Sequence, residues 1–353
     1  MKACCATFGR AARWARMSLA ALATILAISA CGPTASDHAS TSPTQVALPV
    51  SAAPSPQSTQ SVGAIGSPIP AAIRAAVLAA ELPVPRSRAV AIVLGRDILV
   101  CGGLVAGGAT TGSIVSLDTQ ASQITSSGAL AAPVHDAGAA STSALALIFG
   151  GGNAAPSGVV QLVDGISGST IVGHLPMPRA DLSAVAIGDQ LVVAGGGTPA
   201  TRDRRVLTTT DGIHFQTVAT LSIGVRYAAV VAVAGLVYVI GGSTPGGDEA
   251  AIQTVDPRSG VVRVIGQLPH GLSHASALEL GGQLLILGGR TAGQLQDELW
   301  RLDPATGAVV ALDPLPYAVS DAASAVVDGV GYLFGGEGSG GLLSSIISLT
   351  EAV

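Results

Sequence analysis

Short apolar runs that end in a double glycine recur six times along the chain. The runs read ILVCGG, LALIFGG, QLVVAGG, LVYVIGG, LLILGG and GYLFGG. Their first glycines lie 45 to 48 residues apart, at Gly102, Gly150, Gly195, Gly241, Gly288 and Gly335. A fixed period of this length indicates a repeat architecture in which each unit is one supersecondary structure.

Each unit contains the same sequence of predicted elements. A stretch of small apolar residues precedes a tight turn, and the run into the double glycine follows it. After a glycine-rich loop comes a third apolar stretch that ends in a turn, as in Asp256-Pro257-Arg258-Ser259-Gly260. In such a turn Asp accepts from the backbone, Pro fixes φ and Gly takes the left-handed conformation. A fourth stretch completes four antiparallel strands, which is one blade of a β-propeller.

The two ends of the repeat region predict how the ring closes. After Gly335-Gly336 only one further strand remains, LLSSIISLT, so the last blade lacks its fourth strand. Residues 71–83, AAIRAAVLAAELP, precede the first blade and resemble a spare fourth strand. We expect this segment to complete the sixth blade, which removes the free sheet edge.

These units resemble the kelch-repeat family of β-propellers. The resemblance rests on the double glycine after the second strand and on two connecting loops, Leu82–Arg86 (LPVPR) and Leu175–Arg179 (LPMPR), and it extends over residues 72–350. Leu299–Pro304 (LWRLDP) resembles the third strand of the family. The aromatic residue that the family has in its fourth strand is mostly absent here, and Phe215 is its nearest equivalent. The resemblance implies an all-β, six-bladed propeller over residues 71–353.

The first 70 residues differ from the repeats. Residues 1–30 have a basic start followed by an apolar segment of about 14 residues, which is typical of a secretion signal. The segment ends in Ile28-Ser29-Ala30-Cys31, which resembles a bacterial lipobox and implies a lipid on Cys31; an ordinary secretion signal is the alternative. Residues 31–70 are rich in Ser, Thr, Pro and Ala and predict a disordered tether.

Composition narrows the class of partner and the location. The chain is 48% apolar and only 11% charged, and its formal net charge of −5 argues against a nucleic-acid partner. Beyond residue 30, Gly, Asp or Arg interrupts every apolar run before it reaches the length of a membrane span. We therefore expect a monomeric extracytoplasmic protein, attached to the membrane only through the lipid on Cys31.

Six residues stand at one register of the repeat and are candidates for a ligand site. Each lies fourteen positions before the first glycine of its unit: Arg88, Asp136, Asp181, Tyr227, His274 and Asp321. Because innermost strands surround the channel of a propeller, these side chains should face one another at its mouth, where Arg86, His135, Arg179 and Arg226 could extend the set. The alternative is a purely structural set that bonds to neighbouring blades or to trapped water.

No catalytic or metal-binding pattern stands out elsewhere. His270 and His274 lack a third ligand, Cys101 lies within an apolar run and reads as a buried structural thiol, and no cofactor motif is present. The sequence thus favours a module that binds a protein or a small polar ligand over an enzyme. The alternative is an enzyme acting on a polar sugar or sugar acid at the channel mouth, since some kelch-like propellers epimerise sialic acid.

Overall fold

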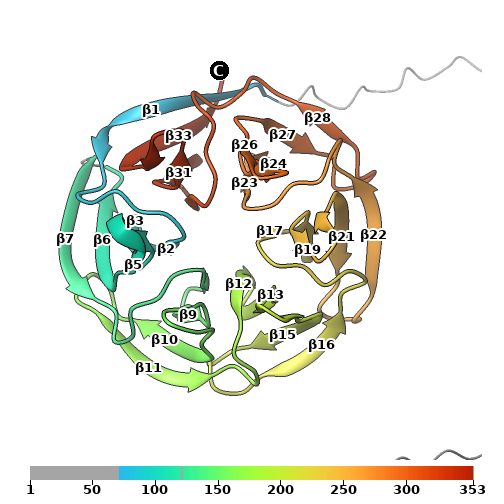
Figure 1. Ribbon diagram of the computed structural model, residues 1–353, viewed down its shortest axis with the longest axis horizontal. Coiled ribbons are helices and arrows are strands. Elements are labelled where there is room, and N and C mark those ends of the chain that lie inside the picture. The colour runs from blue at the N-terminus through green and yellow to red at the C-terminus, as the bar shows by residue number, and fades with distance from the viewer. Residues whose placement is uncertain (1–70, 121, 353) are drawn as a thin grey trace, which may run out of the picture. The chain divides into compact units, whose positions relative to one another are not determined.

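The computed structural model describes residues 71–120 and 122–352. The predicted signal segment, the tether and Cys31 lie outside the described residues. Within the described residues the chain forms six four-stranded antiparallel sheets arranged as the blades of a ring (Figure 1). The predicted six-bladed, all-β propeller is therefore confirmed.

The six blades are built in chain order, each from its innermost to its outermost strand. Blade 1 is β2 (Val90–Leu94), β3 (Asp97–Cys101), β6 (Ser113–Asp118) and β7 (Gln123–Ala129); blade 2 is β8 (Gly138–Ser141), β9 (Ala146–Phe149), β10 (Val159–Val163) and β11 (Ser169–His174). Blade 3 is β12 (Ala180–Ile187), β13 (Gln190–Thr198), β15 (Arg205–Thr209) and β16 (Gln216–Thr220), with β14 (Thr201–Arg202) beside β13. Blade 4 is β17 (Ala229–Val233), β18 (Leu236–Ile240), β21 (Ala251–Val255) and β22 (Val262–Gln267); blade 5 is β23 (Ser276–Leu280), β24 (Gln283–Leu287), β27 (Leu299–Leu302) and β28 (Val309–Ala311).

Blade 6 closes the ring with strands from both ends of the described chain. It consists of β29 (Ala323–Val327), β30 (Val330–Phe334), β33 (Ser345–Glu351) and β1 (Ile73–Glu81). β1 runs antiparallel to β33, with Ile73 opposite Glu351 and Val77 opposite Ile347. The predicted closure by residues 71–83 is confirmed, and it pairs the edge that β33 would otherwise expose.

Short hairpins follow the double glycines at one end of four blades. They are β4 (Leu104–Val105) with β5 (Ala109–Thr110), β19 (Ser243–Thr244) with β20 (Gly247–Asp248), β25 (Arg290–Thr291) with β26 (Gln294–Leu295), and β31 (Glu337–Gly338) with β32 (Gly341–Leu342). A 3-10 turn, η1 (Ala106–Gly108), joins β4 to β5 and is the one helical element of the described residues. No helix in this part of the chain has the length and apolar character to cross a membrane.

The apolar runs of the repeats are buried because blades stack face to face. Ile98, Leu99 and Val100 in β3 are each at most 1% exposed, since neighbouring blades cover both faces of the second strand. One cluster, for example, packs Leu285 of blade 5 against Leu333 of blade 6. Truncating such a leucine to alanine costs about 2–5 kcal/mol in general. The stacking explains continuous rather than alternating apolar strands.

The double glycine is required where each second strand meets the next loop between blades. Gly241 and Gly242 have φ values of 61° and 100°, in the left-handed region that favours glycine. A Cβ on Gly241 would lie 2.2 Å from the carbonyl oxygen of Leu272. The N–H of Gly242 donates to this same carbonyl at 2.8 Å. The repeat signal found in the sequence is thus a close contact between backbones of successive blades.

Candidate functional site at the channel mouth

The six residues of the common register lie together at one end of the channel. Each precedes the first strand of its blade or, in blade 3, occupies the second position of β12. All six have left-handed backbone conformations, with φ between 54° and 58°: Arg88, Asp136, Asp181, Tyr227, His274 and Asp321. We call these six residues the mouth ring. Their predicted convergence is confirmed, whereas their role in binding a ligand stays a prediction.

The backbone of the mouth ring forms a closed circle of hydrogen bonds. The N–H of Asp136 donates to the carbonyl of Arg88, and the N–H of Arg88 donates to the carbonyl of Asp321. The same contact joins every other neighbouring pair, with donor–acceptor distances of 2.8 to 3.1 Å around the circle. The positive φ is what turns each backbone toward its neighbour, so one repeated conformation aligns six blades.

The mouth ring lines a cavity that leads into the channel. All six residues border a cavity of about 140 Å³. Small residues directly after the ring, such as Ala89, Ala137 and Ala228, border both this cavity and the channel below it, of about 500 Å³. The channel wall consists mainly of Ala, Ser and Val from the innermost strands. Polar chemistry is therefore concentrated at the mouth.

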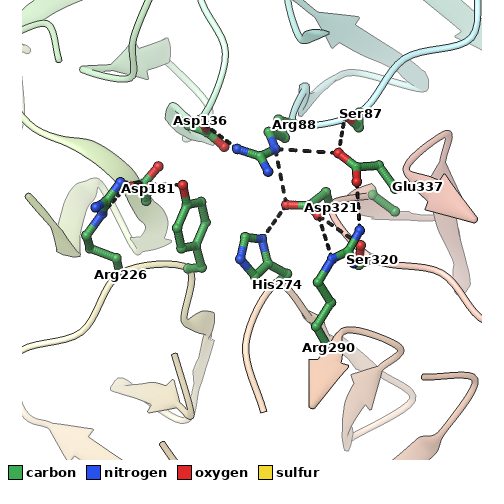
Figure 2. Close-up of polar contacts among 12 residues, drawn as sticks. Ser87, Arg88, Asp136, Asp181, Arg226, His274, Arg290, Ser320, Asp321 and Glu337 are labelled. Carbon is green, nitrogen blue, oxygen red and sulfur yellow. Dashed lines mark hydrogen bonds and ion pairs between the residues drawn. The ribbon is translucent and has the colours of Figure 1, made fainter. Parts of the chain in front are cut away.

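Arg88 connects three carboxylates at this mouth (Figure 2). Its Nη1 donates to Asp136 Oδ2 at 3.2 Å, while its Nε lies 3.6 Å from Asp321 and 3.7 Å from Glu337. Nε is buried and has no hydrogen-bond partner among the described residues. Arg88 thus offsets part of the negative charge of these carboxylates, and its Nε retains donor capacity.

His274 is held from two sides. Its Nδ1 is 2.6 Å from Asp321 Oδ1, and its ring stacks on Tyr227 with centroids 3.9 Å apart. Burial alone would raise the pKa of Asp321, but the hydrogen bond with His274 and the charges of His274 and Arg88 outweigh it, so this pKa lies below its ordinary value. A carboxylate that fixes one ring nitrogen of a histidine leaves the other nitrogen oriented for proton transfer.

Asp136 and Asp181 are the other two carboxylates of the ring. Asp181 is almost fully buried and is paired with Arg226, whose guanidinium also lies over the ring of Tyr227. Burial raises the pKa of Asp136 to about 7; Arg88 opposes the rise, and the charges of Asp181 and Asp321 add to it. Asp136 can therefore hold or release a proton near neutral pH.

The sequence interpretation missed two residues of this cluster, Arg290 and Glu337. Arg290 Nη2 is 2.7 Å from Glu337 Oε2, and its Nε is 3.7 Å from Asp321. Both residues stand two positions after the first glycine of their units, at the start of β25 and β31. This shared position in the repeat was the signal in the sequence that could have identified them, but the other four units carry Leu, Gly or Ser there.

Two of the four residues expected to extend the ring do not reach it. His135 Nε2 lies 3.7 Å from Asp136, and Arg226 pairs with Asp181, so these two belong to the mouth. Arg86 and Arg179 are at most 1% exposed and border neither the mouth cavity nor the channel. Their guanidinium groups donate instead to the carbonyls of Gly102 and Gly195. The expectation for Arg86 and Arg179 was wrong.

The predicted structural role of Cys101 fits its surroundings. Cys101 is a free thiol that is 1% exposed, and burial raises its pKa to about 12. His270, considered as a metal ligand with His274, contacts Glu298 and Thr291 instead. Among the described residues no group of three His, Cys, Asp or Glu side chains is placed to hold a metal ion.

Comparison with known proteins supports the fold. No protein-family model matches the chain, and no curated protein matches it in sequence. A solved structure titled "Structure of YjhT" superimposes with a TM-score of 0.66 at 17% sequence identity, and the match covers 77% of this chain and 96% of that one. At this identity the likeness concerns architecture alone. This chain is a six-bladed β-propeller similar in fold to YjhT.

Proposed function

We propose that this protein is a kelch-repeat lipoprotein, anchored outside the cytoplasmic membrane through Cys31, that binds a small polar ligand or a protein at the mouth ring. The lipobox-like sequence Ile28–Cys31 supports the anchor, and the double-glycine register supports the kelch assignment. The function of a propeller resides in its site rather than in its fold, so the mouth ring is the feature that bears on function.

The observation that carries this proposal is the choice of side chains at six left-handed backbone positions. Glycine adopts such a conformation without steric cost, whereas other residues pay on the order of 1 kcal/mol each. The ring contains Tyr227, His274 and Arg88 at these positions instead of glycine. Strained positions that keep large polar side chains around a cavity are typical of binding sites.

The first strand of the described residues begins away from the mouth ring. β1 begins at Ile73, which pairs with Glu351 at the end of β33. The opposite end of β33 is next to Phe334 and the double glycine, which is where the mouth ring lies. The described chain therefore begins at the end of blade 6 remote from the ring.

A second candidate is an enzyme that acts on a polar sugar or sugar acid by acid–base chemistry. The favouring observation is a pair of titratable groups in one cavity: His274 oriented by Asp321, and Asp136 with its pKa raised to about 7. Groups of this kind suit proton removal and delivery at neutral pH. A catalytic role would make turnover depend on His274 and Asp136 without a comparable dependence of stability.

The test is a thermal-shift and calorimetric screen of the full-length chain in lipid nanodiscs against sugars, sugar acids, amino acids and divalent metals. The expected result is a specific stabilisation that Asp181→Asn abolishes. Asp189→Asn is the matched control, because Asp189 is an exposed carboxylate in the turn that follows the other end of β12. A response that survives Asp181→Asn would place the ligand elsewhere.

The same screen distinguishes a binding module from an enzyme, and a small-molecule ligand from a protein partner. If a compound that binds is also converted, His274→Ala should abolish turnover at an unchanged melting temperature. A flat screen would favour a protein partner, which capture from envelope extracts on the nanodisc-bound chain would then identify, with Asp181→Asn as the negative control.

A further inference from the structure

A second hollow adjoins the mouth ring between blades 6 and 1. It has a volume of about 490 Å³ and lies between the β4–β5 hairpin of blade 1 and the β31–β32 hairpin of blade 6. Its walls are mostly apolar, and Val84 in the loop before blade 1 is 45% exposed. The apolar side chains that line it are Val84, Pro85, Leu104, Val105 and Leu342.

The hollow exists because blade 1 departs from the other repeats. The second and third positions after the first glycine are Leu104 and Val105 in blade 1. The other five units carry polar residues or glycine there: Gly152-Asn153, Gly197-Thr198, Ser243-Thr244, Arg290-Thr291 and Glu337-Gly338. The other units carry residues suited to water at this register, so a partly exposed apolar pair at this one hairpin points to a local contact with something apolar.

Polar contacts connect the wall of the hollow to the mouth ring. Ser87 and Glu337 line the hollow, and the Ser87 hydroxyl donates to Glu337 Oε1 at 3.1 Å. Glu337 in turn contacts Arg88 of the ring and Arg290 (Figure 2). The contact of Glu337 with Arg88 therefore joins the wall of the apolar hollow to the wall of the polar cavity.

Charge and size indicate what kind of ligand fits. Three guanidinium groups, those of Arg88, Arg226 and Arg290, face the carboxylates of Asp136, Asp181, Asp321 and Glu337, and His274 adds a positive charge when it is protonated. A proton on either Asp136 or His274 therefore brings these groups to charge balance. Nearly balanced charges favour hydroxyl groups, which both donate and accept, over an ion. The 140 Å³ mouth cavity is below the usual size of a ligand site, whereas the hollow lies within that range.

We propose that the hollow is the apolar half of the ligand site: the ligand is an uncharged, hydroxyl-bearing molecule with an apolar substituent, whose hydroxyl end contacts the ring at Arg88 and whose substituent lies against Leu104 and Val105. This inference rests on the proposed function, because it takes the mouth ring as the polar half of the same site. It adds the chemical class of the ligand and the residues that select it.

The test compares two probes, 3-phenoxy-1,2-propanediol and glycerol. Glycerol is the polar part of the first compound without its phenyl group. Saturation-transfer NMR titrations use the full-length chain in nanodiscs. The phenoxy compound should bind about tenfold or more tightly than glycerol, since burial of an aromatic group contributes about 1.5–3 kcal/mol. Val105→Asp should remove this advantage. Thr244→Asp, at the same position of the blade 4 hairpin, should preserve it.

Partition of the probe into lipid is common to all variants, so only differences between them are interpreted. Equal binding of the two probes, no detectable binding of either, or an advantage that persists in Val105→Asp would overturn the inference. Asp181→Asn, in blade 3 and outside the hollow, tests the ring separately. If it abolishes binding of glycerol while the phenoxy advantage is absent, only this inference fails. If phenoxy binding is lost in Val105→Asp but unaffected by Asp181→Asn, the proposed function of the ring fails.

Discussion

Arg86 and Arg88 are two residues apart, yet they serve different regions of the molecule. Arg86 is 1% exposed and donates to the backbone carbonyl of Gly102, in the seam where blade 6 meets blade 1. Arg88 is at the mouth, where its partners are the carboxylates of Asp136, Asp321 and Glu337. Backbone carbonyls cannot be exchanged for a ligand without opening the blade, whereas side-chain carboxylates around a cavity can. The seams and the mouth should therefore respond differently to mutation.

The largest expected effect comes from opening a seam altogether. Deleting residues 71–83 removes β1 and leaves β33 as an unpaired edge of blade 6. Because the ring then loses its closure, we expect the cooperative unfolding transition to be lost. Calorimetry and circular-dichroism melts of the full chain with and without the deletion measure this. A cooperative melt at the original temperature would show that β1 does not close the ring.

The next effect concerns a single seam arginine. Arg179 is fully buried, donates to the carbonyls of Gly195 and Arg205, and pairs with Asp203 at 3.0 Å. Arg179→Ala removes these hydrogen bonds and leaves a cavity, while Asp203 keeps its pair with Arg205. The free energy of unfolding should therefore fall by about 2–5 kcal/mol. Denaturant titration measures the change.

Arg290→Ala is the matched mouth variant for this comparison. The Arg290 side chain is 23% exposed, and its partner Glu337 is 26% exposed. Partly exposed pairs contribute about 1 kcal/mol or less, so this variant should be the more stable of the two. If both substitutions cost the same, the distinction between seam and mouth arginines is wrong.

The seam was more predictable from the sequence than the mouth, for a physical reason. The spacing of Gly241 from Gly288 reflects a close contact of each glycine with a backbone carbonyl of the following loop. The equivalent contact is too short for a Cβ in every blade except blade 3, where a Cβ on Gly195 would lie 3.2 Å from the carbonyl oxygen of Val225. The mouth ring was found by the same register. Arg290 and Glu337 were missed because their contacts depend on how hairpins from two blades meet. The burial of Arg86 and Arg179 was missed because an arginine in a loop is expected to be exposed. Only the structure shows the backbone carbonyls that bind these two side chains.

A further expected effect is a pH dependence that belongs to the mouth. Burial raises the pKa of folded Asp136 to about 7, against an ordinary value of 3.8. Between about pH 5 and pH 7 the unfolded chain has therefore lost this proton while the folded chain retains it. Folding takes up a proton, so the contribution of Asp136 to stability is present at low pH and is lost as the pH rises. The maximum slope is about 1.4 kcal/mol per pH unit.

Asp136→Asn isolates this contribution, because asparagine is close in shape and does not titrate. His135 acts in the opposite direction in this range, since burial and the charge of Arg88 lower its pKa, but it does so in both proteins. Asp181 and Asp321 also remain in both. The free energy of unfolding of the wild type, relative to the variant, should fall by about 1 kcal/mol per unit from pH 5 to pH 7 in denaturant titrations. Parallel curves would mean that Asp136 is ionised in the folded state, and the mouth would then carry an excess of negative charge that favours cationic ligands over uncharged ones.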